Sequence, residues 1–193
     1  MKKLSSIAII ATILLIACQN PSTARVEAKN NLPDSTSYID SGNAQVSASV
    51  QDDTLVKEVL QAYLDMKNAL AADQSKEAAT SGEKLLSALN TFPVSSLTSA
   101  QQSEVNEIVS DAKEHAEHIG ENAGNIKHQR EHFQELSNDM YDLLKQVGTS
   151  QTVYKDSCPM VKAIWISEKK QIANPYYGKD MSTCGKVQET IER

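Results

Sequence analysis

The sequence lacks the local signatures of the large enzyme classes and has little positive charge. It contains no glycine-rich phosphate loop, no nucleophile elbow and no internal repeat. Its 19 basic residues are outnumbered by 25 acidic ones, which gives a net charge of −6. This balance argues against nucleic acid or an anionic membrane surface as a partner. We therefore expect a non-catalytic protein whose chemistry lies in its few cysteines, methionines and histidines.

The first 17 residues have the features of an export signal. Lys2 and Lys3 precede an apolar run over residues 7–17, which is too short to span a bilayer as a helix. Leu15-Ile16-Ala17-Cys18 resembles a bacterial lipobox, which implies cleavage before Cys18 and attachment of lipid to it. An ordinary signal peptide with an incidental cysteine is the alternative. The sequence thus predicts a periplasmic lipoprotein, anchored to the outer membrane in preference to the inner one.

The remaining chain divides into a polar linker and one helical domain. Residues 18–53 are turn-rich and indicate a flexible, lipid-anchored linker. From Thr54 onward the apolar residues follow a period of 3.6, which is typical of amphipathic helices. Asp73, Thr98 and Asn125 are expected to cap the second, third and fourth helices, and Gly148 to end the fourth. We predict a mainly α domain over 54–193, a four-helix up-down bundle with an irregular Cys/Met-rich tail packed on it.

The tail contains two cysteines, each close to a methionine. Cys158 and Met160 are two residues apart, and Met181 and Cys184 are three apart. If turns bring them together, two thiols and two thioethers form a soft site that suits Cu(I). The alternative is a disulfide between the cysteines, worth roughly 3 kcal/mol in the chain-entropy model, with the methionines filling the core. Trp165 is expected to anchor the tail on the helices.

All four histidines fall between residues 115 and 132. His128 and His132 have the i, i+4 spacing that can chelate a metal, and His115 and His118 lie near the end of the preceding helix. Antiparallel packing would bring both pairs to one end of the bundle. His118 and His132 are the predicted ligands. His115 is also compatible with a core position, and His128 with a solvated one.

Several blocks are similar to a bacterial domain of unknown function, over residues 55–185. They include Ala116-Glu117-His118-Ile119, Gln129-Arg130-Glu131-His132-Phe133, Cys158-Pro159-Met160 and Asn174-Pro175-Tyr176-Tyr177-Gly178. That domain occurs in small lipoproteins and at the C-terminus of some adaptor subunits of heavy-metal efflux pumps. The resemblance implies copper handling in the periplasm, with an efflux pump or its adaptor as partner. The implied ligands are His118, His132, Cys158, Met160, Met181 and Cys184.

The expected function is therefore the binding of a soft heavy metal, Cu(I) first, in copper homeostasis or efflux. The alternative is a non-catalytic interaction module of an envelope or efflux complex, in which Cys158 and Cys184 form a structural disulfide. An enzyme with a cysteine nucleophile and His132 as base is disfavoured, because no acidic orienting residue or oxyanion motif accompanies the pair.

Overall fold

The computed structural model describes residues 43–192 of the chain, with side chains described from Thr54 onward. The helices come first and the strands last. The helical elements are α1 (Asn43–Ala71), α2 (Ser75–Asn90), η1 (Val94–Ser96), α3 (Ser99–Glu121) and α4 (Ile126–Val147). They are followed by β1 (Val153–Cys158), β2 (Ala163–Ser167), η2 (Gly178–Met181) and β3 (Lys186–Ile191). The signal peptide 1–17, the lipid site Cys18 and most of the predicted linker lie outside the described residues.

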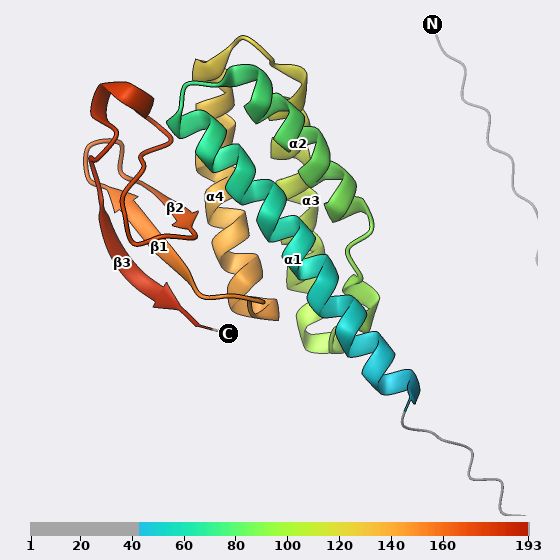
Figure 1. Cartoon of the computed structure of the whole chain (residues 1–193). Coiled ribbons are helices and arrows are strands. Elements are labelled where there is room, and N and C mark those ends of the chain that lie inside the picture. The colour runs from blue at the N-terminus through green and yellow to red at the C-terminus, as the bar shows by residue number, and fades with distance from the viewer. Residues whose placement is uncertain (1–42, 193) are drawn as a thin grey trace, which may run out of the picture. The chain divides into compact units, whose positions relative to one another are not determined.

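The helices pack in the order in which they occur along the chain. α1 contacts α2, α2 contacts α3, and α3 contacts α4, with a short connection at each step (Figure 1). The prediction of a mainly helical domain is confirmed, and the arrangement fits a helical bundle. In the part of the chain that the structure describes, no helix has both the length and the apolar character needed to cross a membrane.

The helix boundaries confirm some predicted caps and correct others. Gln101 accepts a hydrogen bond from the backbone amide of Thr98, Asn125 accepts one from His128, and α4 ends before Gly148, as expected. The first helix begins at Asn43, inside the stretch that was expected to be linker. Residues 43–81 contain neither glycine nor proline, so no helix-breaking residue interrupts the helix there.

Asp73 was predicted to cap the second helix, and this prediction was wrong. The cap position is occupied by Gln74, and Asp73 has a positive φ of 60° in the connection between α1 and α2. Its carboxylate binds Arg130 of α4 instead of the amides at the start of α2. A long-range ion pair therefore replaces the expected local cap.

The C-terminal tail is a three-stranded antiparallel sheet, whereas the sequence suggested an irregular segment. The strand order is β2-β1-β3, which makes β1 the central strand. Its residue Asp156 is paired with Trp165 of β2 on one side and with Val187 of β3 on the other. The sheet lies against the helical layer, mainly through contacts between β2 and α4 (Figure 1).

Aromatic side chains join the sheet to the helices. Tyr63 of α1 and Phe133 of α4 are buried and stack with ring centroids 5.3 Å apart. The Tyr63 hydroxyl accepts a hydrogen bond from the backbone amide of Ile166 in β2, at 3.1 Å, and bonds the Ser137 hydroxyl at 2.8 Å. Trp165 is fully buried in the core that the helices and the tail share, which agrees with its predicted role as an anchor for the tail.

Candidate metal centre

Three histidines gather where α3 ends and α4 begins. His118 lies in the last turn of α3, and His128 and His132 lie on successive turns of α4. The short connection between the two helices brings them to the same end. One nitrogen from each ring lies within 4.8 Å of the other two. Metal–imidazole bonds of about 2 Å place tetrahedral ligand nitrogens roughly 3.3 Å apart. The His118 and His132 rings are stacked with centroids 4.3 Å apart, so the rings would have to turn to close around one ion.

His115 is the neighbour of this group and contacts one of its members. Its Nδ1 lies 3.2 Å from the Nδ1 of His132, which leaves the Nε2 of His132 as the nitrogen available to an ion. On the other side, the Nε2 of His115 lies 3.9 Å from a carboxylate oxygen of Asp139. Because His132 is held through its Nδ1, its ring keeps one tautomer and one orientation. This is usual for a histidine that binds a metal through its other nitrogen.

The electrostatics of the centre favour neutral imidazole at His132. Burial lowers the pKa of His132, and the positive charge that His118, His128 and His115 can carry lowers it further. Neutral imidazole is the form that binds a metal ion. By contrast, burial raises the pKa of Asp139 to about 7, assisted by nearby carboxylates at Asp111, Glu135 and Asp142.

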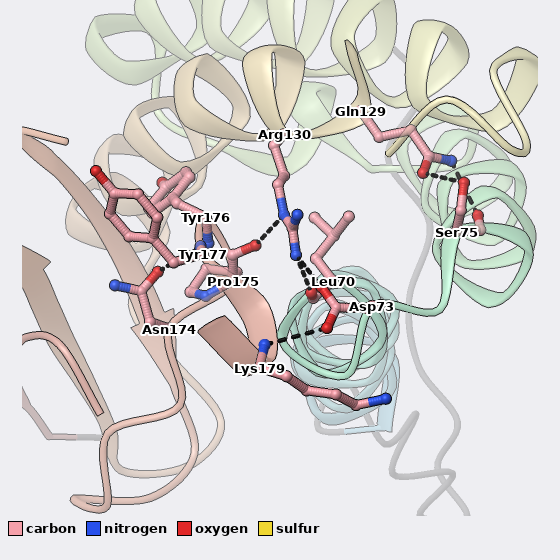
Figure 2. A network of polar contacts seen from close by, with 10 residues as sticks. All are labelled: Leu70, Asp73, Ser75, Gln129, Arg130, Asn174, Pro175, Tyr176, Tyr177 and Lys179. Carbon is pink, nitrogen blue, oxygen red and sulfur yellow. Dashed lines mark hydrogen bonds and ion pairs between the residues drawn. The ribbon is translucent and has the colours of Figure 1, made fainter. Parts of the chain in front are cut away.

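Gln129 and Arg130 lie between His128 and His132 and fix this part of α4 against its neighbours. The Gln129 amide nitrogen donates to the backbone carbonyls of Ser75, at 3.0 Å, and of Ile119, at 3.1 Å, and its oxygen accepts from the Ser75 hydroxyl at 2.6 Å. Arg130 points the other way, toward the end of α1 and the tail (Figure 2). The helical turn that carries His128 and His132 is thus fixed from both sides.

Arg130 also explains the Asn174-Pro175-Tyr176-Tyr177-Gly178 block. The guanidinium donates to the Pro175 carbonyl at 2.7 Å, to the Leu70 carbonyl at 2.9 Å and to the Asp73 carboxylate at 2.6 Å (Figure 2). The hydrogen bond from Arg130 lowers the pKa of Asp73, helped by the backbone amide of Lys179. Gly178 has a φ of +55°, and a Cβ there would lie 2.0 Å from the Asp73 carboxylate. The block is therefore a docking segment that ties the tail to α1 and α4.

Cys158 and Cys184 form a second, separate group. Cys158 ends β1 and Cys184 precedes β3, and their sulfur atoms lie 3.0 Å apart. In the described part of the chain, the three histidines are the only group of three or more histidine, cysteine or acidic residues close enough to share one ion. The thiols do not join them.

The two methionines contact the two cysteines through their backbones. Met160 lies in the turn after β1 and is 61% exposed. Its backbone amide bonds the Cys158 sulfur, while the carbonyl of Met181 accepts the Cys184 amide at 3.1 Å. Four of the six predicted ligands thus separate into a histidine pair and a thiol pair, and the exposed Met160 side chain is not enclosed with the thiols.

Sequence reasoning left out His128 as a ligand and missed the roles of Gln129 and Arg130. The i, i+4 spacing of His128 and His132 was the available signal, but the charged neighbours of His128 favoured a solvated position. The structure gives His128 intermediate exposure and places it beside Glu131, with the His128 Nδ1 3.4 Å from a Glu131 carboxylate oxygen.

The fold and the histidine group together define a helical domain with a candidate metal centre at one end. Residues 59–152 match the family model described as "Protein of unknown function (DUF3347)", so a domain of this kind is present there. The match fits the resemblance seen in the sequence. It includes all three histidines and Arg130 and ends before β1, so the thiol pair lies beyond it. No curated protein and no solved structure matches the chain.

Proposed function

We propose that this protein binds a transition-metal ion through His118, His128 and His132. The observation that carries the proposal is the convergence of one nitrogen from each ring to within 4.8 Å of the others. Three protein ligands leave a coordination position open, as suits an ion that must be passed on. The helices on which they stand are held by the Gln129 and Arg130 contacts, so little ordering is needed when the ion arrives.

Copper is the ion we propose first. Imidazole suits copper, zinc and nickel, and for a given nitrogen site the affinity of divalent ions is highest for Cu²⁺. The sequence-based proposal of Cu(I) applies to the sulfur ligands. The thiols of Cys158 and Cys184 support it by their proximity, whereas the exposure of Met160 gives no support for its thioether as a ligand.

The proposed setting is the periplasm, with the domain held to the membrane by lipid on Cys18. The lipobox-like sequence supports the anchor, and the resemblance to domains of efflux adaptors supports a role in copper homeostasis with a heavy-metal efflux pump as partner. The four-helix up-down arrangement and the binding role are parts of the same proposal: α3 and α4 must run in opposite directions for their histidines to meet.

Calorimetric titration of the purified full chain tests the histidine centre. Zn²⁺ and Ni²⁺ are titrated first, because neither oxidises thiols, and Cu²⁺ is titrated into a Cys158→Ser/Cys184→Ser variant. We expect one ion per chain, binding that weakens in acid as the imidazoles take up protons, and loss of binding in His128→Gln and in His132→Gln. His115→Gln keeps all three ligands and so keeps one ion per chain, but binds it more weakly, because His115 orients His132. Unchanged binding in both ligand variants would refute the histidine centre.

The proposed Cu(I) role of the thiols is tested separately under reducing conditions. Cu(I) that binds in the wild type and is lost in Cys158→Ser/Cys184→Ser supports it. Cu(I) binding that survives this double change assigns the ion elsewhere.

The second candidate function is an interaction module, favoured by the position of the thiols at the junction of two paired strands. Sulfur atoms 3.0 Å apart need little movement to bond. Mass spectrometry of protein isolated without reductant, from cells supplied with metal, discriminates the two functions. A permanent, quantitative disulfide favours the interaction module.

A further inference from the structure

The thiol pair is chemically asymmetric. Cys158 is 1% exposed, whereas Cys184 is partly exposed. The two sulfur atoms lie 3.0 Å apart, within reach of one another. One sulfur is therefore accessible to solvent, and the other is buried beside it.

The segment around the pair is held without a covalent bond between the sulfurs. The buried Asn174 donates to the Cys184 carbonyl at 2.6 Å and accepts from the amides of Tyr176 and Tyr177. Ser157 is paired with Lys186 of β3, which fixes the strands on which the cysteines stand. The fold thus brings the sulfurs together by hydrogen bonds and does not depend on a bond between them. An accessible sulfur in such a pair is typical of labile disulfides.

We propose that Cys158 and Cys184 form a reversible thiol–disulfide site that exchanges with small-molecule disulfides such as oxidised glutathione. Cys184, the accessible sulfur, makes the first bond, and Cys158 closes the ring. This inference is independent of the histidine centre.

The reaction proceeds in two exchanges. Cys184 loses its proton and attacks one sulfur of oxidised glutathione, whose disulfide breaks and releases one glutathione thiolate. Cys158 then loses a proton and attacks the Cys184 sulfur, which forms the Sγ–Sγ bond and releases the second glutathione thiolate. The two released thiolates take up the two protons. The protein dithiol loses two electrons, and one glutathione disulfide becomes two thiols.

Trp165 provides a built-in reporter of this reaction. It is the only tryptophan in the chain, and its indole packs against Gly185, the residue after Cys184. A Cβ at residue 185 would lie 2.7 Å from the Trp165 ring, and the φ of Gly185 is +152°. A disulfide at Cys184 would therefore form close to the indole, where it is expected to change the tryptophan emission.

Redox titration of the full chain tests the proposal. A Cys18→Ser background with a metal chelator is equilibrated in glutathione buffers from fully reduced to fully oxidised, and free thiols are counted by alkylation and mass spectrometry. We expect both thiols to disappear together at an intermediate ratio, to return when the buffer is reversed, and tryptophan emission to follow them. A dithiol that survives excess oxidised glutathione overturns the proposal, as does a disulfide that survives excess reduced glutathione.

Two single variants test the order of steps. Cys158→Ser should trap a mixed disulfide that adds one glutathione to Cys184, because the closing sulfur is missing. Cys184→Ser should remain unmodified over the same time, because the Cys158 sulfur is buried. The opposite pattern overturns the assigned order. Circular dichroism of both variants verifies the fold, and the wild-type titration decides reversibility even if a variant fails to fold.

Discussion

Replacing Asp156 with asparagine tests the electrostatic cost of a carboxyl group buried in β1. Its side chain is fully buried, and among the described residues neither carboxyl oxygen has a hydrogen-bond partner. Burial raises the pKa of Asp156 to about 7, although the nearby charge of Lys67 and the indole of Trp165 act in the opposite direction. The folded protein therefore contains a neutral carboxylic acid at a pH where the unfolded chain carries a carboxylate.

The sign of the effect follows from this raised pKa. Below the ordinary value of 3.8, the carboxyl is protonated in both states and its contribution to stability is fully present. As the pH rises through 7, the folded state must ionise the buried group, and that contribution is lost. At 1.36 kcal/mol per pKa unit the whole loss is at most about 4 kcal/mol, of which about 2–3 kcal/mol falls between pH 5 and pH 9.

Asp156→Asn carries no charge at any of these values and should escape the loss. We expect the free energy of unfolding of the variant, relative to wild type, to increase by about 2–3 kcal/mol between pH 5 and pH 9. Urea unfolding followed by circular dichroism at pH 5, 7 and 9 measures it. Asp139 and His132 also have shifted pKa values, but they are present in both proteins and cancel in the comparison.

The matched control is Asp180→Asn, which removes an exposed carboxyl from η2. Its stability relative to wild type should change little with pH, because surface charges interact weakly. If Asp156→Asn and wild type keep a constant difference in unfolding free energy from pH 5 to pH 9, the carboxyl is not desolvated in the way the fold implies, and the reasoning is wrong.

Three further changes address the contacts that fix the tail. Gly178→Ala should destabilise the fold by about 1–3 kcal/mol in urea unfolding, because the residue has positive φ and its new Cβ would displace the Asp73 carboxylate; an unchanged midpoint would refute the docking role of this segment. Glu168→Gln should cost about 1–3 kcal/mol, because it leaves the buried Lys67 ammonium without the carboxylate 2.8 Å away, and a cost near zero would show that Lys67 finds another partner. Tyr63→Phe should lower the unfolding free energy by about 1–2 kcal/mol through its lost buried hydrogen bonds, and a thermal midpoint equal to that of wild type would contradict this.

The helices and several of their caps could be predicted because their causes are local. The apolar period of 3.6 depends on side chains one turn apart, and the Thr98 and Asn125 caps bond residues three positions away. Asp73 fits the same local pattern, yet its carboxylate binds Arg130, which is 57 residues away in the sequence. The Asp73 carboxylate binds the distant guanidinium in preference to the backbone amides at the start of α2. A prediction from neighbouring residues alone cannot include that ion pair.

The candidate sites divide in the same way. The sequence supplied the residue types: four histidines on two consecutive helices and two cysteines in the tail. The short connection between those two helices predicted that the histidines would lie at one end of the bundle. The sequence did not supply the pairing of β1 with β3, which brings the two sulfurs to 3.0 Å, nor the exposure of Met160.

The sequence by itself determined that the chain from Thr54 to Gly148 is mainly helical and which types of side chain are available to a metal, because periodicity and ligand chemistry are properties of neighbouring residues. Only the tertiary structure decided that imidazoles and thiols occupy separate places. That outcome depends on where the sheet docks and on the Arg130 contact with Pro175 that helps to hold it there, and this contact joins residues far apart along the chain.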